Sequence, residues 1–134
     1  MKKFLALIII VLGLVILTII LVNPGAERRD EESAMKQRQA FARKASQSEA
    51  KEILELIRKK EQEYYADNGT YTKTLDELGI QLPPNANYSY TIERADKTTF
   101  VASAKGNIDN DPIEDFWIID QTGKLRNIVN DLQN

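Results

Sequence analysis

The chain begins with a long apolar run, FLALIIIVLGLVILTIILV, which covers residues 4–22 and contains no charged side chain. As a helix rising about 1.5 Å per residue, this run spans roughly 28 Å, which matches the hydrocarbon core of a bilayer. A cleavable secretory signal has a shorter apolar region of about 7–15 residues and ends in a small-x-small site. Here Pro24 stands where that site needs a small residue. The pattern therefore predicts an uncleaved transmembrane anchor over residues 1–23.

Residues 24–33 break the apolar pattern with Pro24 and Gly25 and then carry dense mixed charge. This composition predicts a short charged linker outside the membrane. Lys2 and Lys3 favour a cytoplasmic N-terminus, and long domains translocate largely regardless of their own charge. We therefore expect a single pass through the inner (cytoplasmic) membrane, with the C-terminal domain on the periplasmic side.

Residues 34–67 consist almost entirely of good helix formers and contain neither glycine nor proline. We expect the C-terminal half of this helix to bury one apolar stripe, whereas residues 34–45 hold fewer apolar side chains and either project from the domain or need a partner. Gly69 can adopt the positive φ of a helix C-cap, so the helix is predicted to end just before it. The apolar side chains at helical spacing are Ala50, Ile53, Leu54, Ile57, Tyr64 and Tyr65, with Leu56 beside them.

Residues 68–87 are predicted to form a loop. Within it Thr74 and Glu77 have the spacing of a capping box, and Gly79 follows them, so one short turn of helix is expected there. The two consecutive prolines that come next prevent any further helix.

The apolar period changes to two in residues 88–130. Apolar side chains alternate with polar ones in YSYTIERA and TTFVASAKG, and two further strand-like segments follow, DFWIID and KLRNIV. The pattern predicts an antiparallel meander of three or four short strands. A half-buried sheet and a helix with one apolar stripe bury both faces by packing together, so we expect an α+β domain over residues 34–134. The side chains expected on the buried face are Tyr88, Tyr90, Ile92, Phe100, Ala102 and Ala104.

Composition excludes most kinds of catalysis. The 134 residues contain no cysteine and no histidine, so disulfides, thiolate metal sites and imidazole bases are absent. No nucleophile–base spacing and no glycine-rich phosphate loop occurs, so we expect neither an enzyme nor a cofactor. The charges balance at 18 basic and 20 acidic side chains, which gives no basic footprint for nucleic acid.

Two separated segments resemble the type IV pilins and the related type II secretion pseudopilins. The first, KASQSEAKEILELIRKKEQEYYADNGTYTKTLDELGI, is similar to their helix-to-loop region, and the second, AKGNIDNDPIEDFWIIDQTGKLRNIVND, to their last strands. The resemblance covers residues 35–131. It implies a helix that lies half in the membrane and half on an antiparallel sheet, in subunits that assemble into helical filaments through apolar stalks. It also implies an inner-membrane platform protein and an assembly ATPase as partners.

The segment NIDNDPIED places four carboxylates, Asp109, Asp111, Glu114 and Asp115, in one predicted loop. Calcium takes several oxygen ligands from flexible acidic loops, and some pseudopilins bind calcium in a loop before their last strands. The spacing lacks the glycine and the terminal glutamate of an EF-hand. A calcium site at these four residues and an acidic surface loop shaped by Pro112 are therefore both open.

The apolar run departs from the pilin pattern, in which a basic leader and a glycine precede a cleavage site and a glutamate is the fifth residue of the mature stalk. Gly13 is the only glycine in the run, and cleavage after it would start the mature chain at Leu14 with Thr18 in fifth place. The remaining stalk would be too short to span a bilayer, and threonine supplies no carboxylate.

Two functions follow as expectations. In the first, the chain is a structural subunit or component of a type IV pilus or type II secretion-like filament system, in contact with the membrane, other copies, other pilins and platform proteins, and present in a surface filament. In the second, it is a membrane-tethered periplasmic accessory or interaction domain that does not polymerise. The domain resemblance favours the first function, and the anchor favours the second.

Overall fold

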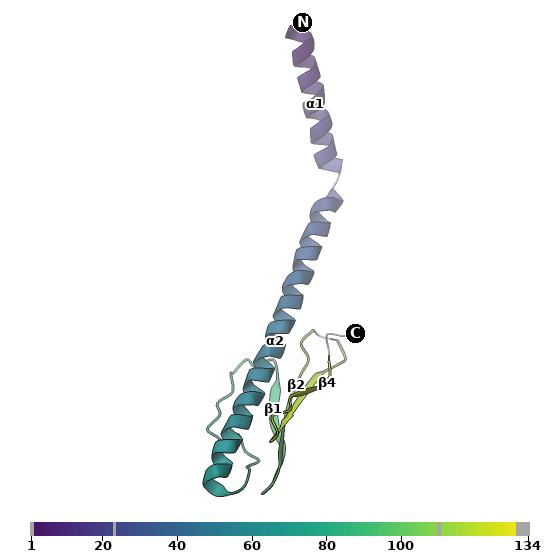
Figure 1. Ribbon diagram of the computed structural model, residues 1–134. Helices are drawn as coiled ribbons and strands as arrows, with labels where there is room; N and C mark the ends of the chain where they lie inside the picture. The colour runs from purple at the N-terminus through teal and green to yellow at the C-terminus, as the bar shows by residue number, and fades with distance from the viewer. Residues whose placement is uncertain (1, 23, 110, 131–134) are drawn as a thin grey trace. The chain divides into compact units, whose positions relative to one another are not determined.

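The computed structural model describes residues 2–22, 24–109 and 111–130, and it is drawn in Figure 1. The chain divides into two units, Met1–Ala40 and Phe41–Asn134. The elements follow the chain in the order α1 (Lys2–Val22), α2 (Pro24–Asn68), β1 (Ser89–Ala95), β2 (Phe100–Gly106), β3 (Asp115–Asp120) and β4 (Arg126–Val129).

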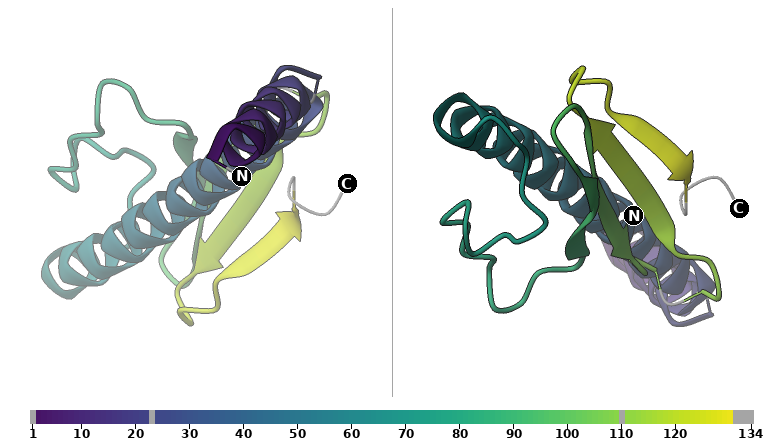
Figure 2. Two further views of the ribbon diagram at one scale, coloured as in Figure 1. Left: turned by 90° about the horizontal axis from the view of Figure 1, so that it is seen from above. Right: turned by 90° about the horizontal axis from the view of Figure 1, so that it is seen from below.

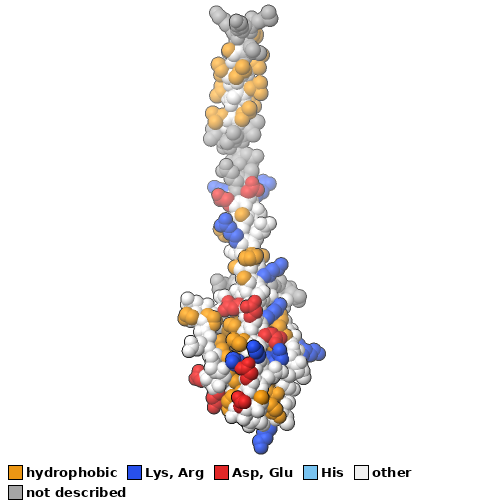
Figure 3. Space-filling view, turned by 60° about the vertical axis from the view of Figure 1, so that its left-hand side comes forward, with side chains coloured by type: hydrophobic (Ala, Val, Ile, Leu, Met, Phe, Trp, Pro, Cys, Tyr) orange, Lys and Arg blue, Asp and Glu red, His pale blue; other side chains and the backbone are white. Residues whose placement is uncertain are grey.

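Helix α1 covers the apolar run that opens the sequence. Its described apolar side chains are exposed, as the consecutive residues Ile8, Ile9 and Ile10 illustrate, each more than half exposed. Figure 3 shows apolar side chains along the face of this helix that is in view. Within the described parts of the chain, no helix meets the length and hydropathy needed to cross a membrane. The anchor over residues 1–23 stays a prediction.

Helix α2 starts earlier than the sequence suggested. The expected linker, residues 24–33, is helical, so the expected start near residue 34 is wrong. Proline is well suited to the first turn of a helix, because its missing N–H has no partner there and its φ is already helical. The segment after Gly25 is rich in good helix formers, and an i,i+4 ion pair between Glu32 and Lys36 (2.7 Å) adds support.

The C-terminal end of α2 confirms the predicted cap. The helix ends at Asn68, and Gly69 follows with a φ of 69°. The Gly69 N–H donates to the carbonyl oxygen of Tyr65 at 2.8 Å, which satisfies one of the last free carbonyls of the helix. Only glycine adopts this backbone conformation without a Cβ penalty.

The four strands form one antiparallel sheet in the order β1-β2-β3-β4, which confirms the predicted meander. Tyr90 pairs with Ala104, and Ala104 pairs with Trp117, so these three side chains share one face of the sheet. The β3–β4 connection turns at Gly123, which has a φ of 78° and donates its N–H to the carbonyl oxygen of Asp120.

The C-terminal half of α2 crosses one face of this sheet (Figure 2). Ala50, Leu54 and Ile57 are completely buried, which confirms the predicted stripe, while Leu56 and Tyr65 at its edges stay more than a third exposed. The helix-on-sheet α+β fold is therefore confirmed for this domain. The other buried apolar side chains are Leu78, Ile80, Tyr88, Tyr90, Ile92, Phe100, Ala102, Ala104, Trp117 and Ile119.

The loop between α2 and β1 contains a turn where a turn of helix was expected. Residues 75–79 form hydrogen-bonded turns, with the N–H of Leu78 donating to Leu75 and that of Gly79 to Asp76. The expected helical turn is therefore wrong. Gly79, with a φ of 64°, ends the segment, because its backbone conformation is not helical.

Candidate functional site

The acidic segment predicted from the sequence connects β2 to β3, and Asn110 within it lies outside the described residues. Arg43 of α2 reaches this loop, and its Nη1 donates to Oδ2 of Asp109 at 2.9 Å. The two side chains are 29% and 15% exposed, so the ion pair is partly shielded from water. It ties the loop to the helix.

Two further carboxylates of the loop, Asp111 and Glu114, have different surroundings. Asp111 accepts the N–H of Ile113 through Oδ1 at 2.6 Å, and its carbonyl oxygen accepts a hydrogen bond from the side-chain amide of Asn107. Such bonds from Asx side chains to nearby backbone shape a turn. Glu114 is exposed to solvent. The loop is therefore folded by its own polar side chains.

Asp115 turns inward at the start of β3 and is completely buried. A carboxylate in such a place is stable only when donors replace water around it. Its donors come from α2, from the residue before β1, from β3 and from β4, so one carboxylate links four parts of the domain. They are Tyr88 Oη (2.5 Å), Trp117 Nε1 (2.6 Å) and Gln47 Nε2 (3.2 Å) to Oδ2, and Asn127 Nδ2 (3.1 Å) to Oδ1.

The four carboxylates predicted as calcium ligands therefore do not point to a common centre. Asp109 pairs with Arg43, Asp115 is in the core, and Glu114 faces solvent. In the part of the chain that the structure describes, no group of three or more acidic side chains is arranged to hold a metal ion. Calcium binding by this loop stays a prediction.

Sequence reasoning missed the partners of Asp115 and Asp109. Gln47 could have been recognised from the sequence, because it lies three residues before Ala50 on the buried stripe of α2. A polar side chain in such a place must find a buried partner. Arg43 and Asn127 gave no such signal, because both lie among polar neighbours that are exposed in most helices and edge strands.

Arg43 allows a direct test of how strongly the loop is held. We expect Arg43→Ala to lower the free energy of unfolding by about 1 kcal/mol, the upper end for a pair that still contacts water. Urea unfolding followed by the fluorescence of Trp117, the single tryptophan, measures this change. Lys36→Ala removes a highly exposed pair on the same helix and serves as the control, with no change expected. Equal values for the two variants would show that Arg43 does not hold the loop.

Two buried tyrosines, Tyr88 just before β1 and Tyr90 within it, give a matched comparison. The Tyr88 hydroxyl donates to Asp115, whereas the Tyr90 hydroxyl is buried without a partner among the described residues. Burial, and then the charge of Glu49, raises the pKa of Tyr90, so its hydroxyl stays neutral.

We expect Tyr88→Phe to lower the free energy of unfolding by about 1.5 kcal/mol, because it breaks a hydrogen bond to a charged group. Tyr90→Phe is expected to leave stability unchanged or to raise it by up to about 1 kcal/mol, because it removes an unpaired polar atom. Chemical unfolding of both variants in parallel checks the difference. The expectation fails if Tyr90→Phe is the more damaging of the two.

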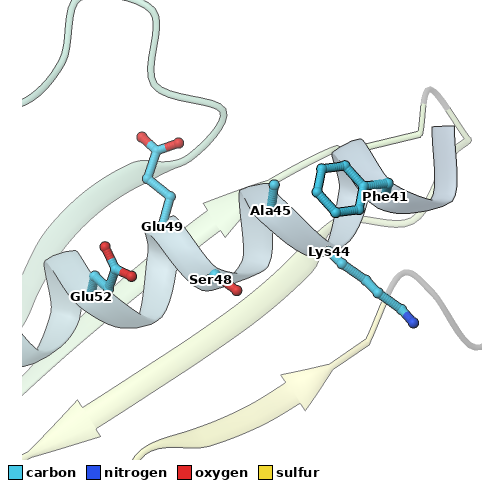
Figure 4. Close-up of a pocket in the computed structure, with 6 residues that line it drawn as sticks. All are labelled: Phe41, Lys44, Ala45, Ser48, Glu49 and Glu52. Atoms are coloured by element: carbon cyan, nitrogen blue, oxygen red, sulfur yellow. The ribbon is translucent and has the colours of Figure 1, made fainter. Parts of the chain in front are cut away.

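The outer face of α2 presents a second candidate surface. A hollow of about 440 Å³ opens beside the helix, and the ring of Phe41 at its end is 77% exposed. In Figure 4 the ring and the small side chain of Ala45 lie next to each other along the helix, with carboxylates farther along it. Aromatic side chains are enriched at protein–protein contact surfaces relative to the rest of the protein surface. The lining residues are Phe41, Lys44, Ala45, Ser48, Glu49 and Glu52.

Comparison with known proteins finds a match to one protein family. A model of the type IV pilin-like G and H family matches residues 47–116, which is just over half of the chain. The match runs from the buried stripe of α2 through β1 and β2 into β3, and it contains both Gln47 and Asp115. It confirms the resemblance to type IV pilins. No curated protein matches the chain.

Proposed function

The chain belongs to the type IV pilin-like G and H family, and on that premise we propose that it is a membrane-anchored, non-catalytic component of a type IV pilus or type II secretion-like filament system. The observation that carries the proposal is the family match, which falls on the helix-on-sheet domain. Proteins of this kind act by packing against other proteins, so we expect the function of this chain to depend on the surfaces that make these contacts.

Helix α1 supports the anchoring part of the proposal. A helix that is apolar on all sides is unfavourable in water and is stabilised by lipid or by a bundle of similar helices. The exposed side chains of Phe4, Ile9 and Leu17 are of this kind. In the proposed orientation α1 crosses the inner membrane once, and the family domain faces the periplasm. Its partners are then the membrane, other copies or other pilins, and assembly platform proteins.

The outer face of α2 supports the packing part of the proposal. Because the opposite face of the helix covers the sheet, Phe41 and Ala45 are left for contacts with another protein. Burying a phenylalanine ring contributes about 1.5–3 kcal/mol, which is a useful share of a subunit contact.

A second function is favoured by one observation in the sequence. Thr18 stands where cleavage after Gly13 would require a glutamate, so this run departs from the usual pilin stalk. In this alternative the chain is a tethered periplasmic accessory domain that contacts filament proteins without entering the filament.

Cell fractionation combined with mass spectrometry of the N-terminus tests the proposal. We expect the chain in the membrane fraction with an intact or merely Met-processed N-terminus, and we expect Val11→Arg with Leu14→Arg to release it, because each central arginine costs about 2.5–3.5 kcal/mol. Conservative Val11→Ile with Leu14→Ile is the control. Recovery of the unaltered chain in the soluble fraction would contradict both functions.

Shearing of intact cells separates the two functions. Recovery of the chain in sheared surface filaments supports the structural subunit, and a methylated Leu14 at the new N-terminus would replace the uncleaved anchor with a processed stalk. Recovery in the membrane alone, when another pilin of the same cells is sheared off, supports the accessory domain.

A further inference from the structure

Glu61 is an acidic side chain on the buried stripe of α2, and it has no exposed surface. Its Oε2 accepts the backbone N–H of Thr72 at 3.1 Å. Its Oε1 is buried without a hydrogen-bond partner, and none of the ion pairs between described residues includes this carboxylate. A buried carboxylate left half unpaired is costly when it is charged.

The loop that follows α2 closes over this carboxyl group. The chain turns back along the helix after Gly69 (Figure 1), and Asn87 at the far end of the loop donates to Ser46 of α2 at 3.0 Å. Next to Glu61, the ring of Tyr71 stacks on that of Tyr65, with centroids 4.6 Å apart. Together with the Thr72 N–H, this aromatic contact holds the first part of the loop against the helix.

The groups around Glu61 favour its protonated form. Burial raises the pKa of Glu61, and the charge of Glu77 from the loop raises it further, while the hydrogen bond from Thr72 acts in the opposite direction. Burial likewise raises the pKa of Tyr71, so this neighbour is neutral. On the helix, the basic residue one turn earlier is Arg58, which donates to Glu55 at 2.8 Å and to Gln62 at 3.2 Å.

Asp115 is a second buried carboxylate in this domain, and it accepts more hydrogen bonds than Glu61 does. At least four donors are shared over both oxygens of Asp115, whereas Glu61 has one donor on one oxygen among the described residues. The first arrangement stabilises a negative charge inside the protein, and the second does not. Glu61 is completely buried, so its unpaired oxygen gains hydration only when the residues that cover it move away.

We propose that Glu61 and Thr72 form a proton-controlled latch between α2 and the loop over residues 69–82. The loop is held closed while the Glu61 carboxyl is protonated, and it opens more often as that group ionises, because the charge then gains hydration. The folded state binds this proton more tightly than the unfolded chain does. The stabilisation is therefore fully present below the unfolded pKa and is lost as pH rises through the folded pKa.

Hydrogen exchange of the purified full chain in detergent micelles tests the latch. The quantity to compare is the opening constant at the Thr72 amide, corrected for the intrinsic pH dependence of exchange, between about pH 3.5, which is below the pKa of an exposed glutamate, and about pH 8. We expect it to increase roughly tenfold for every unit by which the fold raises the Glu61 pKa. In Glu61→Gln the increase is expected to disappear, because the amide cannot ionise. Glu52→Gln, on the exposed face of the same helix, is the control and should keep the wild-type profile.

A purely structural role for Glu61 predicts that Glu61→Gln changes protection equally at both pH values, and that result would overturn the latch. The 13C chemical shift of the Glu61 carboxyl carbon gives a second measurement that needs no variant. A titration midpoint no higher than that of the exposed Glu52 would also overturn it. Both experiments use isolated protein, so their outcomes do not depend on filament assembly.

Discussion

Replacing Asp115 with alanine is expected to lower the free energy of unfolding by about 3 kcal/mol. The substitution leaves several donors buried without an acceptor, and each unsatisfied group costs about 1–3 kcal/mol before the surroundings relax. Tyr88, Trp117 and Gln47 lose their bonds to one oxygen, and Asn127 loses its bond to the other. Because domains of this size are stable by only about 5–15 kcal/mol, the loss is a large share of the total.

The measurement should use far-ultraviolet circular dichroism in urea, because Trp117 is itself a donor to Asp115 and its fluorescence changes directly. Glu114→Ala, at the exposed neighbouring position, is the control, and we expect no effect. Asp115→Asn should be intermediate, since the amide keeps one acceptor oxygen but turns an N–H group toward other donors. A stability of Asp115→Ala equal to that of the control would mean that the network does not hold the domain.

A double-mutant cycle tests whether the donors act as one network. With Asp115 removed, Tyr88→Phe no longer breaks the hydrogen bond to this carboxylate, so most of its cost of about 1.5 kcal/mol should vanish. Additive losses would instead show that Tyr88 contributes through packing alone.

The fold was predictable where local patterns and burial agree. Tyr88, Tyr90 and Ile92 alternate with polar residues, and all three are buried on the face that meets the helix. The end of α2 was equally predictable, because only glycine takes the backbone angles seen at Gly69 without strain. The start of α2 was not, because proline begins a helix as readily as it ends one, and Pro24 follows an apolar helix.

The candidate site was less predictable, because charge alone suggests exposure. Asp115 was grouped with Asp109 and Asp111 in an acidic loop, yet it is completely buried. Its donors lie between 2 and 68 positions away along the chain, so no local pattern could reveal them. The polar positions Gln47 and Glu61 on the apolar stripe were visible in the sequence, and both turn out to hold buried contacts.

Gly106→Ala is expected to be as damaging as the loss of Asp115, with a decrease of about 3 kcal/mol in the free energy of unfolding. A Cβ atom at this position would clash with the carbonyl oxygen of Asn87 and would lie 3.0 Å from Cδ1 of Tyr88. The first neighbour is backbone, so it cannot move aside as a flexible side chain does. Overpacking of this kind usually costs about 1–3 kcal/mol, and we expect the upper end here because a backbone atom is the closest neighbour.

Gly79→Ala separates this clash from the effect of backbone conformation. Gly79 has a φ of 64° and open space around its Cα, so alanine there is strained only by its dihedral angle, at about 1–2 kcal/mol. Gly106 has no such positive φ, and its cost is expected to come from contact alone. A smaller loss for Gly106→Ala than for Gly79→Ala, measured in the same urea series, would contradict the clash.

The clash also has a consequence for the buried network. Gly106 pairs with Asp115 across β2 and β3, so displacing Asn87 and Tyr88 moves the Tyr88 hydroxyl away from the carboxylate. We therefore expect Tyr88→Phe to lower the free energy of unfolding only slightly in the Gly106→Ala background. The same small effect is expected in the Asp115→Ala background. If Tyr88→Phe keeps its full cost there, the strand has relaxed around the new methyl group without disturbing the donor. If Tyr88→Phe instead costs little in both backgrounds, the absence of a Cβ atom at Gly106 is what allows the Tyr88 hydroxyl to reach Asp115.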